Sequence, residues 1–139
     1  MLRRVFLSLA FALFVSPVFA SDVYILVDIS DQTMVVRVDG QVRHTFDVST
    51  GHKGYSTPTG AYGVTRMYRK YHSKKYDGAP MPHSIFFHGG YAIHGTTDLK
   101  RLGRIASHGC VRLHPDNAKT LFALVKEIGS ENTKIWVKS

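Results

Sequence analysis

The chemistry-bearing residues of this sequence gather in two short segments, residues 92–96 and 106–113. The first contains His94, and the second contains His108 and Cys110, the only cysteine among the 139 residues. A thiol becomes a strong nucleophile when it loses its proton, and free cysteine has a pKa of about 8.5. A nearby imidazole can take that proton or hold the thiolate as an ion pair. The pattern therefore predicts a cysteine nucleophile activated by histidine.

Two histidines compete for the role of general base to Cys110. His94 ends an apolar run predicted as a strand and lies 16 positions upstream, enough chain for a loop that returns Cys110 to the strand end. We therefore assign the general base to His94 and an auxiliary role to His108, either in the oxyanion region or in proton transfer. Gly109 leaves the backbone open to a substrate, so that N–H groups there can face a developing oxyanion.

A zinc site is the alternative that the same residue types allow, because imidazole and thiolate are good zinc ligands. The candidates lack the His-x-x-x-His spacing of common zinc hydrolases, and few acidic residues lie nearby. We therefore expect no metal and no cofactor. The test is whether the protein stays active after a chelator has removed metal. The candidate ligands are His83, His88, His94, His108, His114 and Cys110.

Residues 1–20 are typical of a secretory signal peptide. Two arginines precede an apolar run over residues 5–15, which is short for a bilayer span, and small residues stand at the −3 and −1 positions of a cleavage site after Ala20. We expect one exported domain over residues 21–139, in the periplasm or cell envelope. An uncleaved membrane anchor is the alternative. In an oxidising compartment an unpaired thiol is either buried and inert or retained for its reactivity, and the neighbours of Cys110 favour reactivity.

The chain is basic, with 18 Lys+Arg against 10 Asp+Glu and a formal net charge of +8. Such a charge can steer a protein towards nucleic acid, anionic envelope polymers or membrane surfaces. The basic residues concentrate in residues 66–76 among tyrosines, a mixture that can stack on bases. Because the export signal argues against it, we predict no nucleic-acid partner and interpret the segment as a solvated loop beside a substrate groove. Its members are Arg66, Tyr68, Arg69, Lys70, Tyr71, Lys74, Lys75 and Tyr76.

The elements that must position these residues are mostly strands. Asp39-Gly40 between two β-rich runs predicts a tight hairpin, since glycine tolerates the positive φ of such turns. One helix is predicted from Pro115 to about Ile128, with its apolar stripe packed in the core and Gly129 as its stop. The fold class is therefore mainly β, a compact sandwich or pair of mixed sheets with one substantial helix after Cys110. Strands are expected at residues 23–27, 34–38, 42–48, 61–68, 85–87, 91–93 and 134–137.

These motifs resemble the L,D-transpeptidase catalytic domain, also called the YkuD domain. The resemblance covers residues 22–138, and its combination of His-Gly with Ser-His-Gly-Cys is highly specific. It rests on HGT at residues 94–96 and SHGCVRL at residues 107–113, preceded by VSTG at 48–51, TPTG at 57–60 and MPHSIFF at 81–87.

The resemblance implies a cofactor-free enzyme of peptidoglycan biosynthesis. Cys110 would attack the carbonyl between the diamino acid at stem position three and the terminal D-alanine, forming a thioester acyl-enzyme. His94 would take the thiol proton and then protonate the leaving amine, with its ring oriented by the backbone carbonyl of Gly95. The resemblance further implies that N–H groups near Gly109 stabilise the oxyanion.

The remaining matched residues receive supporting roles. Arg112 would serve site architecture or bind a substrate carboxylate, or simply pair with an acidic residue such as Asp116. Ser107 is expected to contact the substrate, and residues 57–60 to form a turn in the groove wall.

The motifs leave the acceptor open. A second stem peptide would give 3→3 crosslinks, a free D-amino acid would give exchange, a lipoprotein would be anchored, and water would make the enzyme a carboxypeptidase. We favour crosslinking or exchange. A non-catalytic peptidoglycan-binding module is the alternative from another class. A carbapenem is expected to acylate Cys110.

Overall fold

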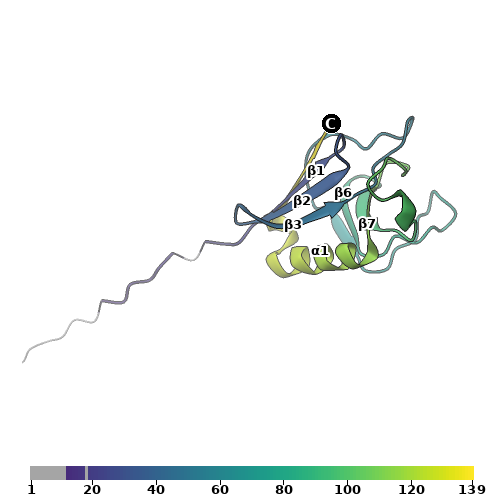
Figure 1. Cartoon of the computed structure of the whole chain (residues 1–139). Helices are drawn as coiled ribbons and strands as arrows, with labels where there is room; N and C mark the ends of the chain where they lie inside the picture. The colour runs from purple at the N-terminus through teal and green to yellow at the C-terminus, as the bar shows by residue number, and fades with distance from the viewer. Residues whose placement is uncertain (1–11, 18) are drawn as a thin grey trace, which may run out of the picture.

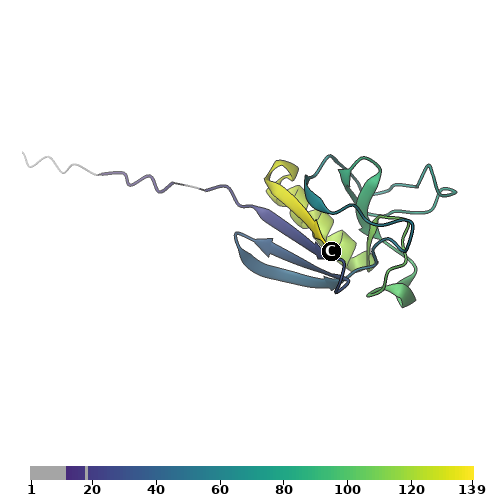
Figure 2. The same cartoon turned by 90° about the horizontal axis from the view of Figure 1, so that it is seen from above.

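The computed structural model describes residues 12–17 and 19–139. Residues 1–11 and 18, which belong to the predicted signal peptide, lie outside the described residues. Residues 12–17 are exposed and run away from the folded domain (Figure 2). Within the described ranges no helix has the length and apolar character needed to cross a membrane.

Alternating burial builds the first sheet. In its central strands every second residue is buried, because one face of the sheet packs on the core and the other meets solvent. Asp39 and Gly40 both have positive φ, 51° and 80°, which confirms the predicted tight hairpin. The strand order is β3 (Gln41–Asp47), β2 (Thr33–Val38), β1 (Val23–Asp28), β9 (Thr133–Lys138) and β4 (Gly60–Gly63), with β1 and β9 parallel.

The second sheet carries apolar residues on both faces, since four of the five residues of its strand β6 are buried. Its last two strands run parallel and are joined by a long loop that includes the short 3-10 helix η1 (Leu99–Arg101). The strand order is β5 (Arg66–Tyr68), β6 (Ser84–His88), β7 (Tyr91–Gly95) and β8 (Val111–Leu113).

Helix α1 (Pro115–Ile128) follows β8 and buries one apolar stripe in the core that both sheets share. Proline begins the helix, and the His114 ring accepts a hydrogen bond from the Asp116 N–H as the N-terminal cap. A 3-10 turn, η2 (Ser130–Asn132), leads from the helix to β9. Figure 1 shows α1 beneath the strands of both sheets. The mainly β fold class with one helix is confirmed.

One expected strand is wrong, because residues 61–68 do not form a single element. β4 pairs with β9 in the first sheet, whereas β5 pairs with β6 in the second. Val64 packs against the core between them, and the Thr65 N–H donates to the Phe86 carbonyl at 2.9 Å. A chain that contributes to two packed sheets must bend at their corner, and alternation of side chains alone does not reveal such a corner.

Candidate active site

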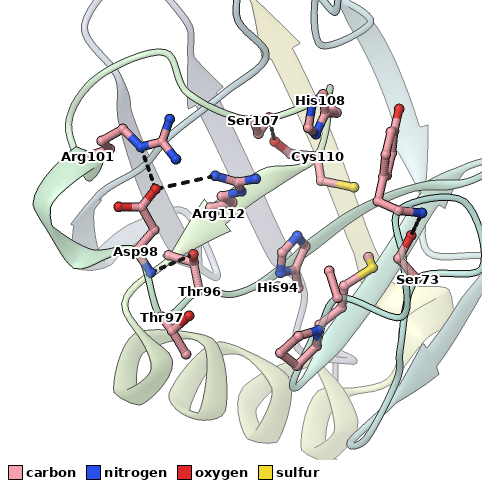
Figure 3. Close-up of a pocket in the computed structure, with 14 residues that line it drawn as sticks. Ser73, His94, Thr96, Thr97, Asp98, Arg101, Ser107, His108, Cys110 and Arg112 are labelled. Carbon is pink, nitrogen blue, oxygen red and sulfur yellow. Dashed lines mark hydrogen bonds and ion pairs between the residues drawn. The ribbon is translucent and has the colours of Figure 1, made fainter.

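Strand alternation places His94, Cys110 and Arg112 on one face of the second sheet. β7 and β8 pair in parallel with His94 opposite Arg112. Ile93 and Val111 are buried in the main core, so their neighbours along the strands project from the other face. There the three side chains line one pocket of about 370 Å³ (Figure 3).

Two loops wall this pocket. The loop between β7 and β8 contributes Thr96, Thr97, Asp98, Arg101 and the segment before Cys110. The loop between β5 and β6 contributes Ser73, Tyr76 and residues 79–81. The basic segment therefore begins as strand β5, where the Arg66 guanidinium lies 4.1 Å from the centre of the Phe86 ring, and becomes a pocket-bordering loop from residue 69.

His94 is held as a neutral base. Its side chain is 6% exposed, and its Nδ1 lies 2.7 Å from the carbonyl oxygen of Gly95. A carbonyl only accepts, so Nδ1 carries the proton and Nε2 keeps its lone pair. Burial lowers the pKa of His94, and the positive charge of Arg112 lowers it further by a smaller amount. The hydrogen bond with Gly95 raises the pKa, but less than burial lowers it, and the resulting pKa is about 4.

The Cys110 thiol is also neutral at rest. Burial raises its pKa, and the backbone N–H of Ala92 and the charge of Arg112 oppose this only in part. Within the part of the chain that the structure describes, its Sγ hydrogen bonds to the Gly90 carbonyl at 3.9 Å and not to the His94 ring. Figure 3 shows that Sγ and the His94 ring both project into the pocket. The arrangement therefore suits general-base transfer during attack rather than a standing ion pair.

The turn before Cys110 is closed by Ser107. Its hydroxyl accepts from the Gly109 N–H at 3.0 Å and donates to the Cys110 carbonyl. Ser107 is 1% exposed, so both hydrogen-bonding functions of its hydroxyl are used inside the turn. This geometry favours a positioning role, and contact of Ser107 with substrate stays a prediction.

Gly109 is required at its position by two independent constraints. Its φ is +118°, a conformation that residues with a side chain rarely adopt. A Cβ there would also lie 2.5 Å from Cε1 of Tyr91. The turn therefore packs tightly beside Tyr91. The Gly109 N–H is engaged by Ser107, whereas neither the His108 N–H nor the Cys110 N–H has an acceptor among the described residues, so these two donors are free for an oxyanion.

His108 lines the pocket and packs its ring among other aromatic side chains. It stacks on Tyr76 with ring centres 4.4 Å apart, and its edge contacts involve Tyr55 at 4.9 Å and His52 at 5.3 Å. This cluster connects the β5–β6 loop to the turn before Cys110. The auxiliary role of His108 in proton transfer stays a prediction.

Arg112 pairs with Asp98 and not with Asp116. Its guanidinium lies 4.0 Å from the Asp98 carboxylate, which also binds Arg101. Asp116 lies instead 3.8 Å from the His114 ring, because α1 carries it away from the pocket. Two guanidinium groups thus share one carboxylate, which leaves one net positive charge at this end of the pocket.

The zinc alternative finds no ligand set in this geometry. His114 caps α1, and His83 packs edge-on against Phe122 with ring centres 5.4 Å apart. Across residues 12–17 and 19–139, no three His, Cys, Asp or Glu side chains are grouped as metal ligands.

A sequence model described as "L,D-transpeptidase catalytic domain" matches residues 22–137. The chain belongs to this family. Among curated proteins it resembles two from Bacillus subtilis, the putative L,D-transpeptidases YqjB and YkuD. It is 29% identical to YqjB over 75% of this chain and 66% of the relative, and 26% identical to YkuD over 73% of this chain and 60% of the relative. The chain thus spans about two thirds or less of these relatives.

Solved L,D-transpeptidases share the fold. The enzyme from Stackebrandtia nassauensis is 31% identical, with a TM-score of 0.74 over 85% of this chain and 56% of that one. The enzyme from Mycobacterium smegmatis is 25% identical, with a TM-score of 0.73 over 86% and 59%. LdtMt1 in complex with imipenem, at 23% identity, has a TM-score of 0.74 over 85% and 59% and shows likeness of fold alone.

The L,D-transpeptidase pocket of this chain contains residues that sequence reasoning missed. Asp98 and Arg101 line it, and His52 and Tyr55 support its mouth. Each lies on a loop outside the recognised motifs, and no periodicity or spacing marks it.

Proposed function

We propose that this protein is an exported cysteine L,D-transpeptidase that acts on peptidoglycan stem tetrapeptides. The observation that carries the proposal is the shared pocket of Cys110 and His94, in which the Gly95 carbonyl holds His94 with Nε2 free as a base. Membership of the L,D-transpeptidase family supports the choice of substrate.

The proposed reaction has two acyl-transfer steps. In the first, His94 Nε2 takes the thiol proton while Sγ of Cys110 bonds to the carbonyl carbon of stem residue three. The tetrahedral intermediate then collapses, the carbon–nitrogen bond breaks, and the imidazolium gives its proton to the departing D-alanine amine. In the second step His94 takes a proton from an acceptor amine as the amine nitrogen bonds to the thioester carbon. The carbon–sulfur bond then breaks, and the imidazolium returns the proton to Sγ.

Electrostatics support an anionic substrate. The intermediate carries its negative charge on oxygen, and the Cys110 N–H would stabilise it. The net positive charge where Arg112 and Arg101 share Asp98 suits a carboxylate of the stem peptide. Arg112 would thus bind substrate as well as support the site.

The acceptor and the location are part of the proposal. We favour crosslinking to a second stem or exchange of the terminal D-amino acid, in the periplasm or envelope. Anchoring of a lipoprotein, hydrolysis by a carboxypeptidase and a non-catalytic wall-binding module are the competing outcomes.

The test is to incubate residues 21–139 with purified stem tetrapeptide and to identify the products by mass spectrometry, beside Cys110→Ala. D-Alanine release with a joined or exchanged product, absent in the variant, supports transpeptidation. Release with a tripeptide alone indicates a carboxypeptidase. Binding of muropeptides without turnover, equal in Cys110→Ala, would assign the protein to the wall-binding class instead.

A carbapenem provides a second test of the nucleophile. Opening of the lactam by Cys110 would add the mass of the intact drug, because no leaving group departs. We expect one adduct on the wild-type protein and none on Cys110→Ala. An adduct that persists in the variant would show that another residue reacts.

A further inference from the structure

We propose that Thr57 is a positioning residue for the oxyanion site, acting through the peptide bond between Gly109 and Cys110. The inference rests on the proposed cysteine acyl transfer and goes beyond it by giving a role in catalysis to residues 57–60. The sequence alone assigns that segment only a turn in the groove wall.

The Thr57 hydroxyl bridges two distant segments. It donates to the Gly109 carbonyl at 2.8 Å and accepts from the Gly51 N–H at 2.9 Å. The directions are fixed, because the carbonyl only accepts and the N–H only donates. Thr57 is 3% exposed, so water does not compete freely for these bonds. Gly51 is suited to this close approach, since a Cβ there would lie 1.8 Å from the Tyr55 carbonyl oxygen.

A planar peptide carries this contact to the nucleophile. The Gly109 carbonyl and the Cys110 N–H belong to one peptide unit, and in a trans peptide they point in opposite directions. Pinning the carbonyl to buried Thr57 therefore aims the N–H away from that wall. The aim of the N–H matters, because a donor stabilises an oxyanion only when it already points at the place where charge develops.

The turn needs such a clamp for two reasons. Gly109 has wide conformational freedom, so the peptide after it is free to rotate unless something holds it. Ser107 binds the Gly109 N–H and the Cys110 carbonyl, the groups on either side of this peptide. The Cys110 N–H has no acceptor among the residues that the structure describes. Thr57 thus holds the peptide whose N–H belongs to Cys110 itself and is free for substrate.

A merely structural Thr57 would hold the loop of residues 51–57 against the turn without affecting the oxyanion. Two reactions of the same thiol separate the roles. Acylation by a carbapenem passes through a tetrahedral oxyanion. Alkylation by iodoacetamide displaces iodide in one step and forms no oxyanion, so its rate reports thiol access and ionisation alone.

The experiment measures both rates by intact mass for wild type, Thr57→Val, Thr57→Ser and Thr59→Val. Valine keeps the shape and removes the hydroxyl, serine restores the hydroxyl, and Thr59 is an exposed threonine of the same segment. We expect Thr57→Val to slow acylation by on the order of 10- to 100-fold relative to alkylation. Thr57→Ser and Thr59→Val should keep the wild-type ratio.

The outcomes are distinct. An equal loss of both rates in Thr57→Val, or an unchanged ratio, would overturn the positioning role, as would a failure of serine to restore acylation. If Thr57→Val does not fold, Thr57→Ala takes its place beside Thr57→Ser, because these two variants differ only in the hydroxyl. An equal acylation-to-alkylation ratio in the two would overturn the positioning role. Wild-type protein that forms no Cys110 adduct would overturn the proposed function itself, and this inference with it.

Discussion

The sharpest consequence of the structure is that activity should persist into acid. The perturbation is pH, and the group that responds is His94, whose pKa burial lowers to about 4 from an ordinary value of 6.5. A lowered pKa keeps the imidazole neutral, and therefore basic at Nε2, down to lower pH. The acid limb of kcat/KM should accordingly fall near pH 4 and not near pH 6.5.

The size of the effect follows from the two values. At pH 5.5 a histidine of pKa about 4 is about 97% neutral, whereas one of pKa 6.5 is about 10% neutral. The protein should therefore retain nearly full activity at pH 5.5, about tenfold more than an ordinary histidine would allow. At the alkaline end the Cys110 thiol, with its raised pKa, should stay protonated beyond the usual range.

The assay is the rate of Cys110 acylation by a carbapenem from pH 4 to 10, with iodoacetamide alkylation in parallel. Alkylation should be slow at neutral pH and still rising above pH 9, since only the thiolate reacts. His44→Gln, a change in β3 of the other sheet, serves as the control. Fast alkylation on a plateau between pH 5 and 8 would refute the neutral pair, and an acid limb near pH 6.5 would refute the lowered pKa of His94.

Three further predictions concern binding and stability. Arg112→Gln should raise KM for stem tetrapeptide about tenfold or more with a smaller change in kcat, and Arg112→Lys should recover part of the lost affinity. A fall in kcat with KM unchanged would contradict a binding role. Gly109→Ala should abolish acylation and lower the free energy of unfolding by about 1–3 kcal/mol because of the positive φ, with a further loss from the clash with Tyr91. The control Gly63→Ala, which has open space around it, should stay active. The free energy of unfolding should fall by about 3 kcal/mol between pH 6.5 and 4, because unfolded His94 takes up a proton before the folded form does; urea titrations that show the same pH slope in His94→Gln would contradict this.

The elements of the fold were largely predictable because their signals are local. Alternating apolar residues, the Asp39-Gly40 turn and the Pro115 start each act within a few residues, and the structure has strands, a hairpin and a helix at these places. The corner at Val64 was not predictable in this way. A chain that leaves one sheet for another keeps its strand-like composition, and only the packing of the two sheets on a common core decides where it bends.

The candidate site divides along the same line. Cys110 and His94 are recognisable because few residue types perform nucleophilic and basic chemistry. Asp98 and Arg101 are recognisable only in the three-dimensional structure, because the sequence allows any of several acidic residues to pair with Arg112. The choice of Asp98 over Asp116 follows from the helix that starts at Pro115, which turns its first acid away from the sheet.

The turn of residues 107–110 shows why a site cannot be divided into separate motifs. Thr57 and Gly109 are 52 positions apart, yet one hydrogen bond joins them, and a second joins Thr57 to Gly51. The contact with Gly51 needs a backbone that approaches closely, and the contact with Gly109 needs a backbone at positive φ. The two glycines and the threonine therefore depend on one another. A sequence shows these residues as turn formers. Their shared function arises because a free backbone donor at Cys110 has to be aimed by groups that are not themselves reactive, and such groups carry no chemical signature of their own.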